Sequence, residues 1–259
     1  MQSRNYSPIR STKAFIILIL AFIVIAWSFH SVGFTIEKVV RGLPPLFDFI
    51  SKLYPPDLSS APTLLESAVE TIQMVIAGTL LGIVLALPLS AMASSNIAPK
   101  PMVAFIRSLL MIVRTIPSLV WALIFVITVG LGPFSGVLAL TFYTVGYLGK
   151  FYYEAIESID METVEGVVSV GASRIQIFTH AVLPQVLPHI VNNFFFMLEY
   201  NIRHASILGF VGAGGLGFYL FLYLQSFEFD KVAMALLVLL GLVIAFDRLS
   251  LEVRRKIVQ

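Results

Sequence analysis

The chain has 259 residues, of which 58% are hydrophobic and only 12% are charged. Soluble domains carry about 45–50% apolar and about 25% charged residues, so this composition excludes a water-soluble fold and predicts a polytopic membrane protein. The net charge of +2 is too small to indicate a nucleic-acid partner, and the lack of cysteine excludes disulfides and thiolate metal sites.

Six segments are apolar enough for membrane spans, which need about 20 mostly apolar residues because lipid offers no partner to an exposed backbone group. The first has a longer apolar run than the core of a signal peptide, so we expect it to be retained as a helix. The third contains two arginines, and the sixth is short. The predicted spans are residues 14–33, 68–93, 102–129, 135–153, 190–209 and 232–246.

Lysine and arginine are distributed unevenly between the predicted loops. With a cytoplasmic N-terminus, eleven lie inside and four outside, and this bias predicts that both termini are cytoplasmic. The outer segment 43–56 mixes prolines with Phe and Tyr, so it is either an interfacial segment at the lipid head groups or an ordinary loop. We divide the chain into an N-terminal membrane helix with a periplasmic interfacial segment (1–60) and a membrane domain (61–259).

The longest predicted cytoplasmic loop, residues 154–189, interrupts the apolar sequence with a patterned polar stretch. Apolar positions follow i, i+3, i+4 spacing from Val164 to Phe178, which predicts a short amphipathic helix with one apolar stripe. Pro184 cannot continue a helix from the residues before it, so we expect an interruption there. Such a helix either docks on another protein or lies on the lipid surface.

Aligned on Glu165, this stretch resembles the coupling loop of membrane subunits of binding-protein-dependent ABC importers, E-A-A-x3-G-x9-I-x-L-P. Gly166 and Val167 stand at the two alanines and Ala181 at the isoleucine, but the spacing is intact. The resemblance implies that the segment docks on a nucleotide-binding subunit. The residues that it assigns to ATPase coupling are Glu165, Gly166, Gly171, Ala172, Leu183 and Pro184.

Residues 114–126, 130–157, 182–188 and 209–217 are similar to the permease subunit of phosphonate importers, and the resemblance extends over roughly residues 60–250. It implies an all-α, type I ABC importer permease in the bacterial inner membrane. The permease is expected to act as a homodimer with two ATP-binding subunits and a periplasmic phosphonate-binding protein. It would move a phosphonate inward by alternating access, with ATP and Mg²⁺ on the partner subunits and no cofactor on this chain.

A glycine-rich stretch satisfies the dinucleotide pattern G-x-G-x-x-G, but it follows a membrane span rather than a strand, so we expect no dinucleotide site. No P-loop sequence occurs, and we therefore expect no ATPase site and no enzyme activity in this chain. The stretch is either a plain turn or, as the resemblance implies, part of a periplasmic gate. The gate candidates are Gly212, Gly214, Gly215 and Gly217.

Ionisable residues inside membrane spans are costly and are usually functional or paired. Glu199 and Arg203 lie four residues apart with Glu first, the better order for a helical ion pair, and for Arg203 the sequence favours this structural role. Arginine also offers planar donors that suit a phosphonate anion. We expect the fifth span to line much of the translocation pathway. The pathway candidates are Arg114, Asn193, Glu199, Asn201 and Arg203.

A ridge of small residues on the second span, Gly78, Gly82 and Ala86, predicts a close helix contact. The contact lies either within the bundle or across a homodimer. The four histidines form no ligand-like cluster, so no metal site is expected.

Other functions stay open. The cargo could be phosphite, phosphate or another oxyanion. An ion-driven secondary transporter would need acids inside the membrane, for which Glu199 is best placed, with Glu66 and Glu70 near an outer edge. An intramembrane enzyme would need a catalytic set that the spacing does not provide.

Overall fold

The computed structural model describes residues 8–257, and within them every regular element is helical, as predicted. The chain separates into two units, Met1–Lys52 and Leu53–Gln259. The sequence placed this boundary at residue 60. It lies earlier, at Lys52, because the chain beyond Lys52 already packs on the second unit. The Asp57 N–H donates to the Asp230 carbonyl at 3.1 Å, for example.

The first unit consists of α1 (Pro8–Ser31) and α2 (Ile36–Lys52). In α1, Lys13–Ser31 is long and apolar enough to span a membrane, and its side chains are exposed within this unit. In α2, ion pairs one turn apart join Arg41 to Glu37 and Lys52 to Asp48, both at 2.6 Å. Most of the segment 43–56, which was expected to be interfacial or a loop, belongs to α2 and is helical.

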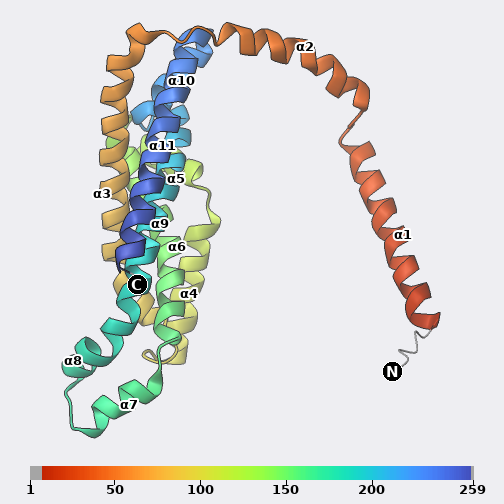
Figure 1. Cartoon of the computed structure of the whole chain (residues 1–259). Helices are drawn as coiled ribbons and strands as arrows, with labels where there is room; N and C mark the ends of the chain where they lie inside the picture. Colours follow the sequence, from red (N-terminus) through yellow and green to blue (C-terminus); the bar gives the residue numbers. More distant parts are fainter. Residues whose placement is uncertain (1–7, 258–259) are drawn as a thin grey trace. The chain divides into compact units, whose positions relative to one another are not determined.

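The second unit is a bundle of long helices (Figure 1). Three helical stretches are long and apolar enough to span a membrane: Leu58–Ala93, Ile175–Val211 and Phe229–Lys256. They contain α3 (Ala61–Ala93), α9 (Leu183–Leu208) and α11 (Phe229–Ile257).

The predicted third span, residues 102–129, is not one straight helix. It consists of α4 (Lys100–Thr115) and α5 (Ser118–Val129), which are bent by 87° relative to one another and count as one broken span or a re-entrant loop. The break lies at Ile116 and Pro117, which both have extended backbone with ψ of 120° and 146°. Proline disfavours the helical conformation in the residue before it and donates no hydrogen bond, so the helix ends there.

The predicted fourth span corresponds to α6 (Pro133–Glu157), which packs against α3, α4, α5 and α9. Fourteen of its 25 residues are buried. It is not among the helices that are apolar enough by composition to cross a membrane, and neighbouring helices cover most of its surface. Its composition therefore reflects close packing more than contact with lipid.

The small residues of α3 make that close packing possible. A Cβ added at Gly78 would lie 3.0 Å from the Val137 carbonyl, and one added at Gly82 would lie 2.5 Å from the side chain of Thr144. Both neighbours belong to α6. The ridge predicted on the second span is therefore a contact within the bundle.

One short helix, α10 (Gly215–Gln225), has no counterpart among the predicted spans. It is apolar but only 11 residues long, and it packs against α3, α9 and α11. A membrane span needs about 20 residues, so a rule based on length passes over such a helix.

Candidate functional site

The predicted coupling loop forms α7 (Met161–Ser169), a turn and α8 (Arg174–Ile177), which project from one end of the bundle (Figure 1). Asp160 caps α7: its carboxylate accepts from the Glu162 N–H at 3.0 Å and from the Thr163 hydroxyl at 2.8 Å. Gly171 follows α7 with a φ of +77°, a conformation that favours glycine. The prediction of a single helix from Val164 to Phe178 is therefore wrong, because this glycine turn divides it.

The chain then continues from α8 into α9 through a π-turn, Phe178–Val182. The Leu183 N–H donates to the Phe178 carbonyl five residues earlier and closes the wide turn. Pro184 lies in the first turn of α9, where its missing N–H costs no hydrogen bond. The α-helical pattern is therefore interrupted just before Pro184, as expected, but by a π-turn and not by a break in the helical path.

A side-chain clasp holds this segment to the bundle. The Asp160 N–H donates to Gln185 Oε1 at 2.7 Å, and Gln185 Nε2 donates to the Ala181 carbonyl at 2.8 Å. The clasp joins the start of α7 to the start of α9. The sequence patterns did not single out Gln185, although it follows directly after Leu183 and Pro184, two of the coupling candidates.

Beyond the clasp, the α7–α8 segment offers a free surface. No residue of α7 is buried, and apolar side chains are exposed, with Val170 at 82% and Ile175 at 77%. An added Cβ at Gly166 or Gly171 would meet no atom within 4 Å. Of the coupling candidates, Glu165, Gly166, Gly171 and Pro184 are exposed, and Ala172 and Leu183 are half-buried. The segment is therefore shaped for contact with another surface.

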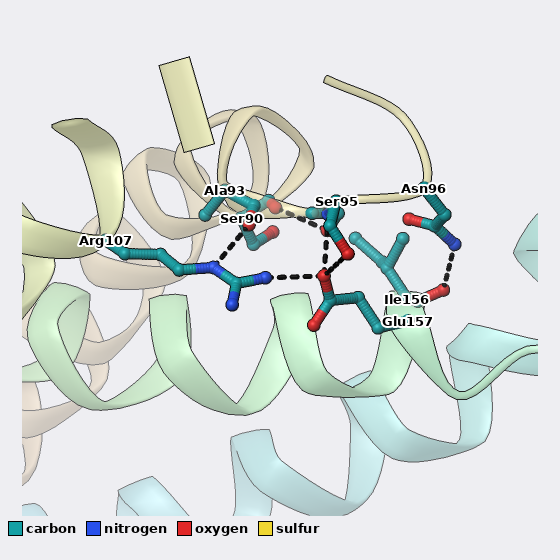
Figure 2. A network of polar contacts seen from close by, with 8 residues as sticks. Ser90, Ala93, Ser95, Asn96, Arg107, Ile156 and Glu157 are labelled. Atoms are coloured by element: carbon teal, nitrogen blue, oxygen red, sulfur yellow. Dashed lines mark hydrogen bonds and ion pairs between the residues drawn. The ribbon is translucent and has the colours of Figure 1, made fainter. Parts of the chain in front are cut away.

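A polar network braces the bundle just before this segment (Figure 2). Glu157, the last residue of α6, accepts from Arg107 Nη2 at 2.5 Å, from the Ser95 N–H at 2.6 Å and from the Ser95 hydroxyl. Arg107 Nε donates to the Ala93 carbonyl at 2.9 Å, and Asn96 Nδ2 donates to the Ile156 carbonyl at 2.8 Å. The α3–α4 loop is thus fastened to the point where the α7–α8 segment begins.

These contacts change the acidity of Glu157. Burial by itself raises the pKa of this carboxyl, but the hydrogen bonds from Ser95 and the charge of Arg107 outweigh burial and hold the pKa below its ordinary value. The carboxylate is therefore charged at neutral pH and keeps the loop in place.

Within α9, Glu199 pairs with Arg203 on the next turn, as the spacing predicts. Its second oxygen lies 3.7 Å from Arg254 of α11. The Glu199 side chain is 14% exposed, whereas that of Arg203 is 51% exposed. Glu199 therefore joins two helices electrostatically, and about half of the Arg203 side chain stays exposed.

Asn201 is fully buried in the bundle. Its amide donates to the hydroxyls of Thr79 on α3 and Thr144 on α6, both at 2.9 Å. A side chain without exposed surface is poorly placed to line a pathway, so this contact favours a structural role for Asn201. Asn193 lies half-buried earlier on the same helix, and the structure leaves its predicted pathway role untested.

A second polar link in the bundle was not recognised in the sequence. His204 of α9 lies 2.8 Å from the Ser118 hydroxyl of α5 through Nδ1, and 3.4 Å from the Tyr143 hydroxyl of α6 through Nε2. The Tyr143 and Tyr200 rings are stacked, and the His204 ring contacts both of them in a tilted arrangement. The only sequence signal was a histidine and two tyrosines within predicted spans, whose proximity depends on the packing of separate helices.

The glycine-rich stretch is a turn that leads into α10. Gly214 and Gly215 have φ of +81° and +70°. The Gly215 N–H donates to the carboxylate of Glu70 on α3 at 2.7 Å, and the Leu216 N–H donates to the Thr71 hydroxyl at 2.8 Å. Glu70, which was expected near an outer edge of the membrane, here caps the positive end of α10.

The other gate candidates also have packing roles. A Cβ added at Gly217 would overlap the Ser206 carbonyl of α9, so glycine permits the backbones of α9 and α10 to meet. The Gly212 carbonyl accepts from the Gly132 N–H at 2.9 Å and joins this turn to the start of α6. The turn therefore connects α3, α6 and α9 at one end of the bundle.

Within residues 8–257, no three His, Asp or Glu residues lie close enough together to hold a metal ion. The acidic side chains make separate contacts along the helices: Glu199 with arginines, Glu70 with α10 and Glu157 with the α3–α4 loop. The arrangement combines a braced bundle with one projecting segment.

Comparison with known proteins agrees with these features. Residues 78–258 match the family described as binding-protein-dependent transport system inner membrane component. A relative from Stutzerimonas stutzeri, the putative phosphite transport system permease protein HtxC, is 37% identical over 239 residues, which cover 92% of this chain and 84% of the relative. The phosphate-import permease protein PhnE of Mycolicibacterium smegmatis is 34% identical over 95% of this chain and 44% of its own length.

The fold is similar to a solved structure of the MetNI methionine ABC transporter in an inward-facing conformation. The TM-score is 0.69, with 22% identity, and the similarity covers 78% of this chain and 99% of that chain. The predicted all-α bundle of an importer permease is thereby confirmed. The chain belongs to the family of binding-protein-dependent transport system inner membrane components, the membrane-embedded permease subunits of ABC importers.

Proposed function

We propose that this permease imports a phosphorus oxyanion, with a phosphonate as the expected cargo and phosphite or phosphate as the alternatives. The observation that carries this proposal is the similarity to phosphite and phosphate permeases over more than nine tenths of the chain. The named relatives favour inorganic oxyanions. A phosphonate is favoured by the resemblance of residues 114–126, 130–157, 182–188 and 209–217 to phosphonate permeases. The common chemistry is a small tetrahedral anion.

Transport is driven by two ATP-binding partner subunits, which hold ATP and Mg²⁺ and dock on the α7–α8 segment. Three features support this role: the exposed apolar side chains, the accessible Glu165 and the open space that a Cβ added at Gly166 or Gly171 would enter. Because the clasp and the Glu157 network fasten the ends of the segment to α3, α6 and α9, force applied there reaches the bundle directly.

The active unit is a homodimer that receives its cargo from a periplasmic binding protein. Both termini and the α7–α8 segment lie in the cytoplasm, and the glycine turn at the opposite end of the bundle forms part of the periplasmic gate. Arg203 and Asn193 keep accessible surface for the pathway, whereas the contacts of Glu199 and Asn201 favour bracing.

Uptake by reconstituted cells tests this function. Labelled methylphosphonate, phosphite and phosphate are offered to cells lacking this chain, with the chain restored alone or with its ATPase and binding-protein partners. We expect uptake of at least one oxyanion only when all three components are present. Uptake by the chain alone that depends on the proton gradient would instead identify an ion-driven transporter.

A further inference from the structure

A small cavity on the bundle brings three cationic side chains together. Its volume is about 100 Å³, and it lies between α4 and α6. The lining residues are Arg107, Leu110, Met111, Arg114, Lys150 and Tyr153. No carboxylate is among them, although Glu154 and Glu157 are nearby in the sequence of α6.

The two helices hold this cavity open by a close backbone crossing. A Cβ added at Gly146 would lie 2.8 Å from the Arg114 backbone N, and one added at Gly149 would lie 2.7 Å from Leu110. The glycines thus let α4 approach α6 and place Arg114 and Lys150 on opposite walls. The positions of the two cations are set by this crossing and not by flexible loops.

The three cations differ in how far their charge is already compensated. Arg107 is anchored: it donates to Glu157 at 2.5 Å and to the Ala93 carbonyl, and its guanidinium lies 4.4 Å from the centre of the Tyr153 ring. Lys150 has one exposed partner, Glu154, at 3.3 Å. The contacts of residues 8–257 include no ion pair or hydrogen bond of the Arg114 side chain. Lys150 and Arg114 therefore keep unused donors.

We propose that this cavity binds a tetrahedral oxyanion between Arg114 and Lys150, with Arg107 and Tyr153 as its fixed wall. A planar guanidinium and an ammonium facing one space are suited to the oxygens of a phosphoryl group. A water molecule needs about 10–15 Å³ of such space, so a cavity of about 100 Å³ has room for a small anion.

Two sources supply this chemistry: the phosphate of an anionic phospholipid head group, or a free phosphorus oxyanion passing through the permease. The free-anion source rests on the proposed function, whereas the lipid source does not. Both require the same two donors, so the same variants test them, and the composition of the surrounding lipid distinguishes them.

The experiment uses the purified full-length chain in nanodiscs. In phosphatidylcholine alone, binding of radiolabelled inorganic phosphate is measured by equilibrium dialysis. In a parallel series, the shift of the thermal midpoint is measured when phosphatidylglycerol replaces part of the phosphatidylcholine. The variants are Arg114→Gln and Lys150→Gln. Lys100→Gln, which removes an exposed cation from the same helix outside the cavity, is the matched control.

We expect Arg114→Gln and Lys150→Gln to weaken phosphate affinity about tenfold or more, or to abolish the phosphatidylglycerol shift, while Lys100→Gln behaves as wild type. Loss in the phosphate series identifies a free-anion site, and loss in the lipid series identifies a head-group site. Arg114→Lys, which keeps the charge, should restore part of the effect and shows that the fold is intact. Equal behaviour of all variants in both series would overturn the proposal.

Uptake measured in cells keeps this result separate from the proposed function. If wild-type uptake requires all three components but neither variant changes anion or lipid binding, only the cavity site is refuted. If the variants lose binding but no combination of components takes up an oxyanion, the site stands and the proposed cargo is wrong.

Discussion

Glycines lie in both the α3–α6 contact and the α7–α8 segment, but their surroundings differ. Around Gly78 and Gly82 the neighbouring helix leaves no room for a single added carbon, whereas around Gly166 and Gly171 there is open space. In the bundle, glycine allows two backbones to pack closely within the membrane. In the projecting segment, it leaves a surface uncovered. Glycine thus lies in a packed helix contact between α3 and α6, and on an uncovered surface in the α7–α8 segment.

The largest effect is expected where a glycine lets two helix backbones pack against each other. Gly217→Val would place its side chain against the Ser206 carbonyl, which cannot move away as a flexible side chain can. We expect a loss of more than about 3 kcal/mol of stability and little folded protein. Gly241→Val on α11, where an added Cβ meets nothing within 4 Å, is the control and should fold normally. Yield and thermal midpoint in detergent are measured for both variants. Equal stability of Gly217→Val and Gly241→Val would exclude close contact of α9 and α10.

Reversing the charge on the open segment should affect transport and leave the fold unchanged. Glu165 is exposed on α7, so Glu165→Lys should alter the thermal midpoint by less than about 2 °C. Oxyanion uptake should fall about tenfold or more, because contact with the ATPase subunit is weakened. Glu252→Lys, at an exposed position of α11 outside the segment, should transport as wild type. Full uptake by Glu165→Lys would remove Glu165 from the coupling surface.

A smaller effect is expected from the buried polar contact of the bundle. Asn201→Ala removes two hydrogen bonds, and helix-to-helix hydrogen bonds in membranes contribute about 0.6 kcal/mol each, so the expected loss is about 1 kcal/mol. Asn193→Ala, at a half-buried position of the same helix, should lose less. The free energy of unfolding of the two variants provides the comparison. A larger loss for Asn193→Ala would contradict the structural role assigned to Asn201.

The smallest effect is expected from the Glu157 network, which lies between the bundle and the α7–α8 segment. Because the pKa of Glu157 is lowered in the folded chain, its carboxylate adds stability above its ordinary value of 4.5, and this contribution is lost as the pH falls through the lowered pKa. The stability difference between wild type and Glu157→Gln should be less than about 1 kcal/mol at pH 7 and should shrink below about pH 4.5. Thermal midpoints measured from pH 7 to pH 3 test this. A difference that grows with acidity would contradict the assigned charge of Glu157.

Local pattern was sufficient for much of the architecture. The length and apolar content of the spans predicted the long helices, because a helix in lipid must satisfy its own backbone. The i, i+4 spacing of Glu199 and Arg203 predicted their ion pair, since residues one turn apart face the same side of a helix. The Glu165-to-Pro184 spacing identified the projecting segment, although its glycine was expected to continue the helix that it ends.

Other features depend on which helices meet. The sequence by itself determined that this chain is a helical membrane protein with one polar segment set apart, because hydropathy and turn residues act over a few neighbours. Only the tertiary structure decided that Glu70 caps α10, that Asn201 is buried between Thr79 and Thr144, and that Arg114 and Lys150 face one cavity. Each of these contacts joins helices distant in sequence, and their partners follow from close packing of small residues that no single helix specifies.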